Sequence, residues 1–135
     1  EKKLKEYRKY DRQIRKRLGE AAIYLWEDKN YMIVPAAKCE ELMREGRTLH
    51  HCVGTNDTYM KRMAAGISWI LFLRHKEHPE EPYYTIEISM KDDEILQWYS
   101  EYDRKPGRGM IEKVLMRFRK SVKRKRMKEA KKEIA

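Results

Sequence analysis

Apolar residues in the first 27 positions recur at the spacing of one helical face. They lie three, four or seven positions apart, at Leu4, Tyr7, Ile14, Leu18, Ala21 and Leu25. Such spacing places side chains on a single stripe of an α-helix. The stripe is interrupted at Asp11, and Gly19 lowers helix stability by roughly 1 kcal/mol relative to alanine. We expect residues 1–27 to form a long amphipathic helix that can bend or break in this region.

The next stretch alternates between short strand and short helix signals. "NYMIVP" predicts a strand that ends at Pro35, and "AKCEELMREG" predicts a brief helix that Gly46 terminates. "RTLHHCV" alternates, so an extended chain would point His50 and Cys52 to one side. The opposite side would hold Leu49, His51 and Val53, and at least one of His51 and Cys52 should be buried.

The second half of the chain predicts an antiparallel sheet followed by a helix. "TNDTYMKRMAAG" has the polar start and glycine stop of a short helix. "ISWILFLR", "YYTIEISM" and "ILQWYS" then follow as three strand candidates. From "GRGMIEKVLMRF" onward, apolar positions again have helical spacing, and the helix continues past Val122 with cations exposed to solvent.

These elements predict an α+β fold: a three- or four-stranded, mainly antiparallel sheet packed by N-terminal and C-terminal helices. We expect one domain over residues 1–135. It would comprise an N-terminal amphipathic helix at 1–27, an α+β core at 31–104 and a basic C-terminal helix at 109–135.

Positive charge is concentrated at the two ends of the sequence. The formal net charge is +10 at pH 7, of which residues 1–18 contribute +6 and residues 105–135 contribute +10, leaving −6 for residues 19–104. Two basic arms around an acidic middle are typical of a protein that binds a phosphate backbone or an anionic membrane. Solvated helix faces explain the same distribution, so the charge leaves both interpretations open.

Neither membrane insertion nor a disulfide framework is expected. No stretch approaches the roughly 18 uninterrupted apolar residues of a membrane span, and "EKKLKEYRKY" precedes no apolar signal region. Only two cysteines are present, Cys39 and Cys52, and a cytosolic setting keeps both thiols reduced. We expect a cytoplasmic protein without a cofactor, although a chain that starts at Glu1 is typical of a fragment.

Four residues are candidates for a catalytic patch. A neighbouring histidine such as His50 would activate Cys52 as a nucleophile. On the "YYTIEI" strand, Glu87 shares a face with Thr85, and a carboxylate there is costly unless that face meets water, a substrate or a cationic partner. With Gln97 on the next strand, His50, Cys52, Glu87 and Gln97 could converge. A packed cysteine and a solvated outer sheet face are the alternatives.

Zinc coordination is a weaker interpretation of the same segments. Sulfur and imidazole donors of the types that zinc prefers come from Cys39, His50, Cys52 and one of His75 or His78. Their "C-x10-H-x-C" spacing matches no compact zinc pattern. We therefore predict no metal site.

Aromatic and basic residues near the C-terminus are candidates for nucleic-acid contacts. In "QWYSEYDRKPGR" they interleave, so exposed aromatic rings could stack on bases while arginines bind phosphates. A place in the hydrophobic core is the alternative for the aromatic rings. The cationic candidates are Arg104, Arg108, Arg117, Arg119, Lys120, Lys123, Arg124, Lys125 and Arg126.

The order of several segments is more informative than any one of them. "EELMREGRTLHHCVG", "ILFLR", "EEPYYTIEI" and "LQWYSEYDRKP" follow one another along the chain. This series resembles the PcfJ-like family of conjugative plasmids, phages and related mobile elements, over about residues 33–106. Two positions depart from the expected pattern: Cys39 stands where a small helix-starting residue such as serine is expected, and Trp98 where a smaller residue is expected.

The resemblance implies an accessory role in nucleic-acid processing, as in a relaxosome, and it transfers no established catalytic residues. "LHHCVGT" also resembles, more weakly, the histidine, glycine and threonine element of ADP-ribosyltransferases, in which a later glutamate is catalytic. Val53 changes that spacing, and Glu87 would be the corresponding acid.

Our leading hypothesis is a nucleic-acid-binding accessory module of a mobile genetic element. Its partners would be nucleic acid and a protein of a relaxosome-like or phage complex, with no membrane partner. One alternative is an enzyme that uses the His50, Cys52, Glu87 and Gln97 patch. The other is a protein-binding inhibitor or adaptor whose acidic middle meets a basic partner.

Overall fold

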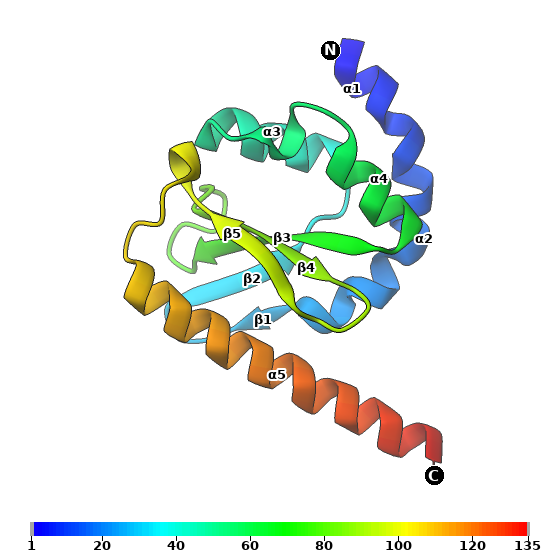
Figure 1. Ribbon diagram of the computed structural model, residues 1–135, viewed down its shortest axis with the longest axis vertical. Helices are drawn as coiled ribbons and strands as arrows, with labels where there is room; N and C mark the ends of the chain where they lie inside the picture. The colour runs from blue at the N-terminus through cyan, green and yellow to red at the C-terminus, as the bar shows by residue number, and fades with distance from the viewer. Residues whose placement is uncertain (1, 135) are drawn as a thin grey trace.

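A five-stranded antiparallel sheet forms the middle layer of the protein (Figure 1). The structure is a computed structural model that describes residues 2–134 of the 135-residue chain. The α+β class and the antiparallel meander are confirmed, but the sheet has five strands instead of three or four. In spatial and chain order they are β1 (Trp26–Glu27), β2 (Tyr31–Pro35), β3 (Ser68–His75), β4 (Tyr84–Ser89) and β5 (Ile95–Tyr99).

The N-terminal helical segment is shorter than predicted and is interrupted once. It consists of α1 (Lys2–Tyr7), the 3-10 turn η1 (Arg8–Tyr10), α2 (Asp11–Ala21) and the 3-10 turn η2 (Ala22–Tyr24). Gly19 lies inside α2 and causes no break. The predicted helix over residues 1–27 is wrong beyond η2, because Trp26 pairs with Ile33 in the sheet and its ring packs edge-on against Phe118. Glu1 lies outside the described residues.

The segment containing "LHHCVG" is the main correction to the predicted fold. Instead of a strand, α3 (Cys39–Leu49) continues through Gly46, ends at His50 with φ 53°, and leads into the 3-10 turn η3 (Cys52–Gly54). Two glycines permit this turn to fold back on its helix. A Cβ at Gly46 would lie 3.1 Å from the Gly54 nitrogen, and a Cβ at Gly54 would lie 2.5 Å from Met43 Cα.

The predicted alternation of sides survives in this turn, although the predicted strand does not. Leu49, His51 and Val53 are buried, whereas His50 and Cys52 are exposed. The expectation that at least one of His51 and Cys52 is buried is therefore confirmed.

The remaining helices follow the sequence pattern. α4 (Thr58–Ala65) ends at Gly66, whose φ of 73° suits a residue without a side chain. The 3-10 turn η4 (Glu101–Asp103) follows β5, and α5 (Arg108–Ile134) begins five residues later. Lys125 and Arg126 are still half-buried and contact Ile23, Leu25 and Asp93, whereas residues 127–134 are all exposed, so about two turns of the helix extend past the rest of the domain (Figure 1). This confirms the predicted extension into solvent; Ala135 is outside the described residues.

The two faces of the sheet are covered by different helices. α5 covers one face, where apolar side chains such as Leu73, Tyr84 and Ile86 are buried. α3, η3 and α4 cover the opposite face, where Thr85 and Glu87 are buried among apolar neighbours, and α2 packs on α4. The alternative of a solvated outer face around Glu87 is therefore wrong, because helices cover that face as well.

Among the helices that the structure describes, none is both long enough and apolar enough to cross a bilayer.

Candidate functional site

A buried ion pair anchors α3 to the sheet. Arg74 of β3 donates to both carboxylate oxygens of Glu45 in α3, at 2.6 and 3.0 Å, and their side chains are 11% and 2% exposed. The Thr85 hydroxyl donates to the same carboxylate at 3.0 Å. Burial raises the pKa of the Glu45 carboxyl, and the bidentate Arg74 guanidinium opposes that rise.

His51 extends this network into the "LHHCVG" turn. Its Nε2 lies 2.9 Å from the Thr85 hydroxyl oxygen, and its Nδ1 lies 3.4 Å from the Val53 nitrogen. Because the hydroxyl proton of Thr85 goes to Glu45, we infer that His51 carries its proton on Nε2 and accepts at Nδ1. Burial lowers the pKa of His51, which favours this neutral form.

A second buried carboxylate, Glu87 at the centre of β4, orders the neighbouring edge strand. One oxygen accepts from Arg62 at 2.8 Å and from the Ser68 hydroxyl at 2.6 Å. The other accepts from the Gln97 amide at 2.9 Å, and the same amide nitrogen donates to the Tyr59 hydroxyl at 2.9 Å. Both oxygens of Glu87 are thus occupied by protein donors that fix α4 against β5.

A groove of about 470 Å³ runs along β5, the strand at one edge of the sheet. Two of the four segments on which the family resemblance rests meet here: "LHHCVG" contributes Cys52, and "LQWYSEYDRKP" contributes most of the lining. The lining residues are Cys52, Tyr59, Ile95, Leu96, Gln97, Trp98, Tyr99, Asp103 and Lys105.

Direct contacts between the same two segments hold the groove in shape. The His50 ring stacks on Tyr102, with centroids 4.7 Å apart and planes 7° apart. His51 meets Tyr99 edge-on at 4.8 Å. His50, Tyr102 and Asp103 all have positive φ, between 53° and 60°. Positive φ is costly for residues other than glycine, and such residues concentrate at functional sites.

The four predicted catalytic residues are only partly brought together. Cys52 and Gln97 line the groove, and Glu87 lies behind Gln97. His50 is exposed, as Cys52 is, but it does not line the groove; it follows the last residue of α3 and stacks on Tyr102. The histidine that faces the sheet is His51, which the sequence patch did not include. The catalytic role of these residues stays a prediction.

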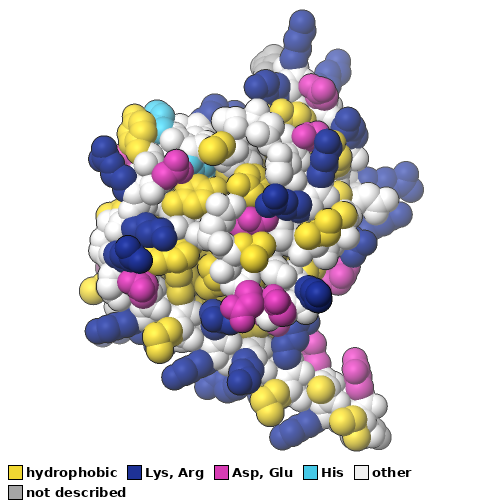
Figure 2. All heavy atoms as spheres, viewed as in Figure 1, with side chains coloured by type: hydrophobic (Ala, Val, Ile, Leu, Met, Phe, Trp, Pro, Cys, Tyr) yellow, Lys and Arg dark blue, Asp and Glu magenta, His cyan; other side chains and the backbone are white. Residues whose placement is uncertain are grey.

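A second feature lies on the solvent side of α5, where six basic residues share one side of the helix. Their spacing of three and four positions keeps them within a band roughly 80° wide over about 27 Å of helix. We call this set the cationic stripe: Lys113, Arg117, Lys120, Arg124, Lys128 and Lys131. All six are exposed. Figure 2 shows basic side chains along α5 and around the N-terminal helices, with acidic side chains between the two groups.

The opposite flank of α5 carries cations that are already paired. Arg126 binds Asp93 at 2.9 Å and Arg119 binds Glu94 at 2.9 Å, both acidic residues coming from the β4–β5 turn. Within the helix, Arg108 lies 3.4 Å from Glu112. These intramolecular pairs reduce the positive potential on this flank.

The nine predicted phosphate-binding cations therefore fall into distinct environments. Arg117, Lys120 and Arg124 belong to the cationic stripe, where only Arg117 has an ion-pair partner, Asp28, among residues 2–134. The Lys125 ammonium donates to the main-chain oxygens of Ile23 and Leu25, and burial lowers its pKa. Arg104 lies over the Tyr102 ring, and Lys123 is exposed beside the paired flank.

The sequence-based list missed three members of the stripe: Lys113, Lys128 and Lys131. Their spacing relative to Arg117 and Arg124 was the available signal. This spacing places the six residues on one side only if the helix is continuous from residue 108 to residue 134.

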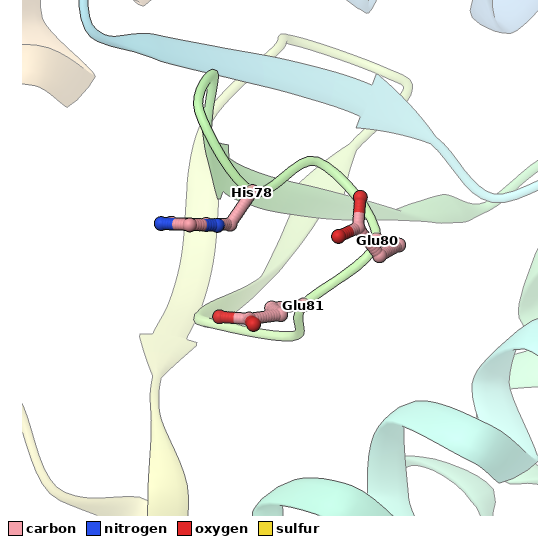
Figure 3. A group of neighbouring side chains, drawn as sticks. All are labelled: His78, Glu80 and Glu81. Atoms are coloured by element: carbon pink, nitrogen blue, oxygen red, sulfur yellow. The ribbon is translucent and has the colours of Figure 1, made fainter.

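Possible metal ligands gather on the loop between β3 and β4, away from the groove residues. Ligand atoms of His78, Glu80 and Glu81 lie within 4.8 Å of one another, and all three residues are exposed (Figure 3). Exposed acidic side chains often cluster without a metal, so we assign none here. Cys39, one of the zinc donors considered above, is buried and its thiol lies 3.3 Å from the Tyr7 carbonyl oxygen.

Comparison with known proteins identifies the family of this α+β domain. The chain belongs to the PcfJ-like protein family, whose model matches residues 1–115. This match is wider than the expected 33–106 and includes the N-terminal helices.

One curated relative extends this comparison. The uncharacterized protein Lin1253/Lin1744 of Listeria innocua is 32% identical over 77 residues, which cover 57% of this chain and 16% of the relative. The aligned segment thus spans about a sixth of the relative's length. No solved structure matches.

Proposed function

We propose that this domain is a nucleic-acid-binding accessory module of a mobile genetic element, and that the cationic stripe of α5 binds the phosphate backbone. Membership of the PcfJ-like family supports the mobile-element context. In a relaxosome-like or phage complex the module would act in the cytoplasm beside a protein partner.

The observation that carries the proposal is the arrangement of the stripe. Six exposed cations follow one side of a helix that extends past the sheet, and no acidic residue lies on that side between residues 108 and 134. Arg117 pairs with Asp28 at the surface, where ion pairs contribute little and exchange readily for a phosphate. Phosphate contacts dominate the affinity of proteins for nucleic acid, and such a surface binds without reading sequence.

The competing hypotheses have less support in the contacts. Acidic residues of the middle segment, among them Asp28, Asp93 and Glu94, already pair with cations of α5. An adaptor surface built from them would first have to release those cations. For the enzyme hypothesis, both oxygens of Glu87 are occupied by protein donors.

Charge reversal on the stripe tests the proposal. If four stripe cations neutralise phosphates, the logarithm of duplex affinity should fall with the logarithm of salt at a slope of about −3.6. Changing Lys120, Arg124 and Lys128 to glutamate should weaken binding roughly 100-fold or more near 100 mM salt and flatten the slope to about −0.9. Fluorescence anisotropy with a labelled duplex at several salt concentrations measures both quantities.

The matched control moves the same charge change to another helix. Arg12, Arg15 and Lys16 are exposed on α2, and changing all three to glutamate alters the net charge by the same amount. This variant should retain most of its affinity and its steep salt slope. An equal loss in both triple variants would mean that binding follows net charge alone, and unchanged binding in the stripe variant would remove α5 from the proposal.

A further inference from the structure

The groove along β5 exposes part of several aromatic rings whose remaining surface packs against the core. Trp69 is fully buried and its indole nitrogen donates to the Ala36 carbonyl, whereas Trp98 is only partly buried on the edge strand. Tyr59 and Tyr99, also partly buried, line the same groove. The Trp98 ring lies on the α5 side of β5, with its centroid 5.6 Å from that of Tyr84, whereas Tyr59 and Tyr99 lie on the other side. Trp98 is therefore the ring at this edge on which a planar ligand can stack.

Cations lie beside these rings. The Lys105 ammonium lies 4.2 Å from the centre of the Trp98 ring, and the Arg104 guanidinium lies 5.6 Å from the centre of the Tyr102 ring. Both cations are exposed, and neither has an ion-pair partner among residues 2–134. They can therefore bind phosphates that flank a stacked base.

Polar groups across β5 from Trp98 match the edge of a nucleobase. The Gln97 amide nitrogen is held by Tyr59 and Glu87. Its orientation is thereby fixed, and the side-chain carbonyl remains available to accept a hydrogen bond. The Asp103 carboxylate is a second acceptor in the groove. Base edges carry N–H donors that such acceptors recognise once the base is unpaired.

The wall of the groove is held in a costly conformation. Tyr102 and Asp103 are consecutive residues with φ of 54° and 60°, and Tyr102 stacks on His50, whose φ is 53°. Stacking between these segments supports a backbone arrangement that each segment alone would avoid. The backbone conformation that these contacts support places Asp103 and Lys105 at the groove.

From these observations we propose that the β5 groove binds an unpaired base of a single-stranded nucleic acid. The base stacks on Trp98, Lys105 and Arg104 bind the adjacent phosphates, and Gln97 and Asp103 accept from the edge of the next base where the nucleic-acid strand crosses β5. This rests on the proposed nucleic-acid function and refines it: α5 supplies affinity for any backbone, and the groove adds a preference for single strands.

The test compares strands that differ only in their bases. An eight-nucleotide oligothymidylate and an abasic strand of the same length carry the same phosphates. Stacking of one base should make the wild-type protein bind the oligothymidylate roughly 5- to 100-fold more tightly than the abasic strand. Trp98→Leu should remove most of this difference while leaving affinity for a duplex within about twofold.

Trp26→Leu is the matched control, because Trp26 is a partly buried tryptophan on the opposite edge strand of the same sheet. It should keep the preference for bases, and circular dichroism checks that both variants are folded. Equal affinity of the wild type for the oligothymidylate and the abasic strand would overturn the inference. So would a preference that persists in Trp98→Leu.

The two proposals fail in different ways. The stripe reversal should lower affinity for the oligothymidylate, the abasic strand and the duplex alike, without changing the ratio between the first two. If the reversal leaves duplex binding intact while Trp98→Leu removes the preference for bases, the groove inference stands and the stripe is wrong. If the stripe variant alone loses binding and no strand shows a preference for bases, the groove inference is wrong and the stripe stands.

Discussion

The two faces of the sheet are both buried, but they are held by different forces. Beneath α5, side chains such as Phe118, Leu73 and Tyr84 exclude water through apolar area, which is non-directional. Beneath α3 and η3, Arg74 and Glu45 are held by directional hydrogen bonds with defined partners. The apolar face therefore fixes how strongly a helix is attached, and the polar face fixes where the groove-forming turn lies.

The largest expected effect is on the apolar face. Phe118→Ala should lower the free energy of unfolding by about 3–5 kcal/mol, because it removes a fully buried ring and leaves a cavity. Met116→Ala, at an exposed position of the same helix, should change it by less than about 0.5 kcal/mol. Urea denaturation measures both values, and similar effects for the two variants would show that α5 is not packed on this face.

On the polar face, breaking the buried ion pair of Arg74 and Glu45 should lower the free energy of unfolding by nearly as much. Arg74→Met should cost about 3 kcal/mol of stability, because the Glu45 carboxylate loses its bidentate partner in a buried position. Arg117→Met, which breaks a surface pair of similar length with Asp28, should cost no more than about 1 kcal/mol.

A double variant sharpens the comparison between the faces. When Arg74→Met is combined with Glu45→Met, no buried charge remains unpaired, so much of the lost stability should return. The double variant could instead lose as much stability as Arg74→Met alone. That result would mean that the ion pair itself stabilises the fold and does more than position α3.

A smaller loss is expected from Thr85→Val, which keeps the shape of the side chain and removes its hydroxyl. Glu45 loses a donor and His51 Nε2 loses its acceptor, so stability should fall by about 2 kcal/mol. Thr48→Val, at an exposed position of α3, should be almost neutral. Equal stability of the Thr85 and Thr48 variants in urea denaturation would argue that the hydrogen-bond chain contributes nothing.

The smallest expected effect is a pH dependence that comes from His51. Its folded pKa is lowered by burial, so the unfolded chain binds a proton first as the pH falls below about 6.5. Protonation of the unfolded state destabilises the fold, and wild-type stability should decline over this range. His51→Gln should reduce the decline, whereas His50→Gln at the exposed neighbouring position should not. Parallel pH profiles for all three proteins would contradict the buried neutral histidine.

Side-chain periodicity alone predicted much of the fold. Strand signals in "ISWILFLR", "YYTIEISM" and "ILQWYS" identified β3, β4 and β5. The first is a continuous apolar run, as expected of a strand buried on both faces, and the second alternates. The alternation also separated Leu49, His51 and Val53 from His50 and Cys52 correctly, although it left open which side is buried and the segment is a helix end and a 3-10 turn. β1 could not be found this way, since two residues are too short to show a period.

The α3–η3 turn depended on contacts that periodicity does not contain. Gly46 carried the signal of a helix stop, yet its missing side chain is used for a close approach of Gly54. The sequence placed His50 beside Cys52 in the candidate patch, whereas His50 follows the last residue of α3 in an αL conformation and its ring stacks on Tyr102.

By itself, the sequence determined that the chain is an α+β domain with basic ends, and that α5 bears cations at helical spacing. Only the tertiary structure decided which of these cations are free, because their acidic partners Asp93 and Glu94 come from a turn that the sheet places beside α5. It likewise brought "LHHCVG" to the edge strand, where His50 meets Tyr102 and the groove forms. Helical and strand periods are local properties of the backbone, whereas ion pairs and grooves depend on which distant segments the packed core brings together.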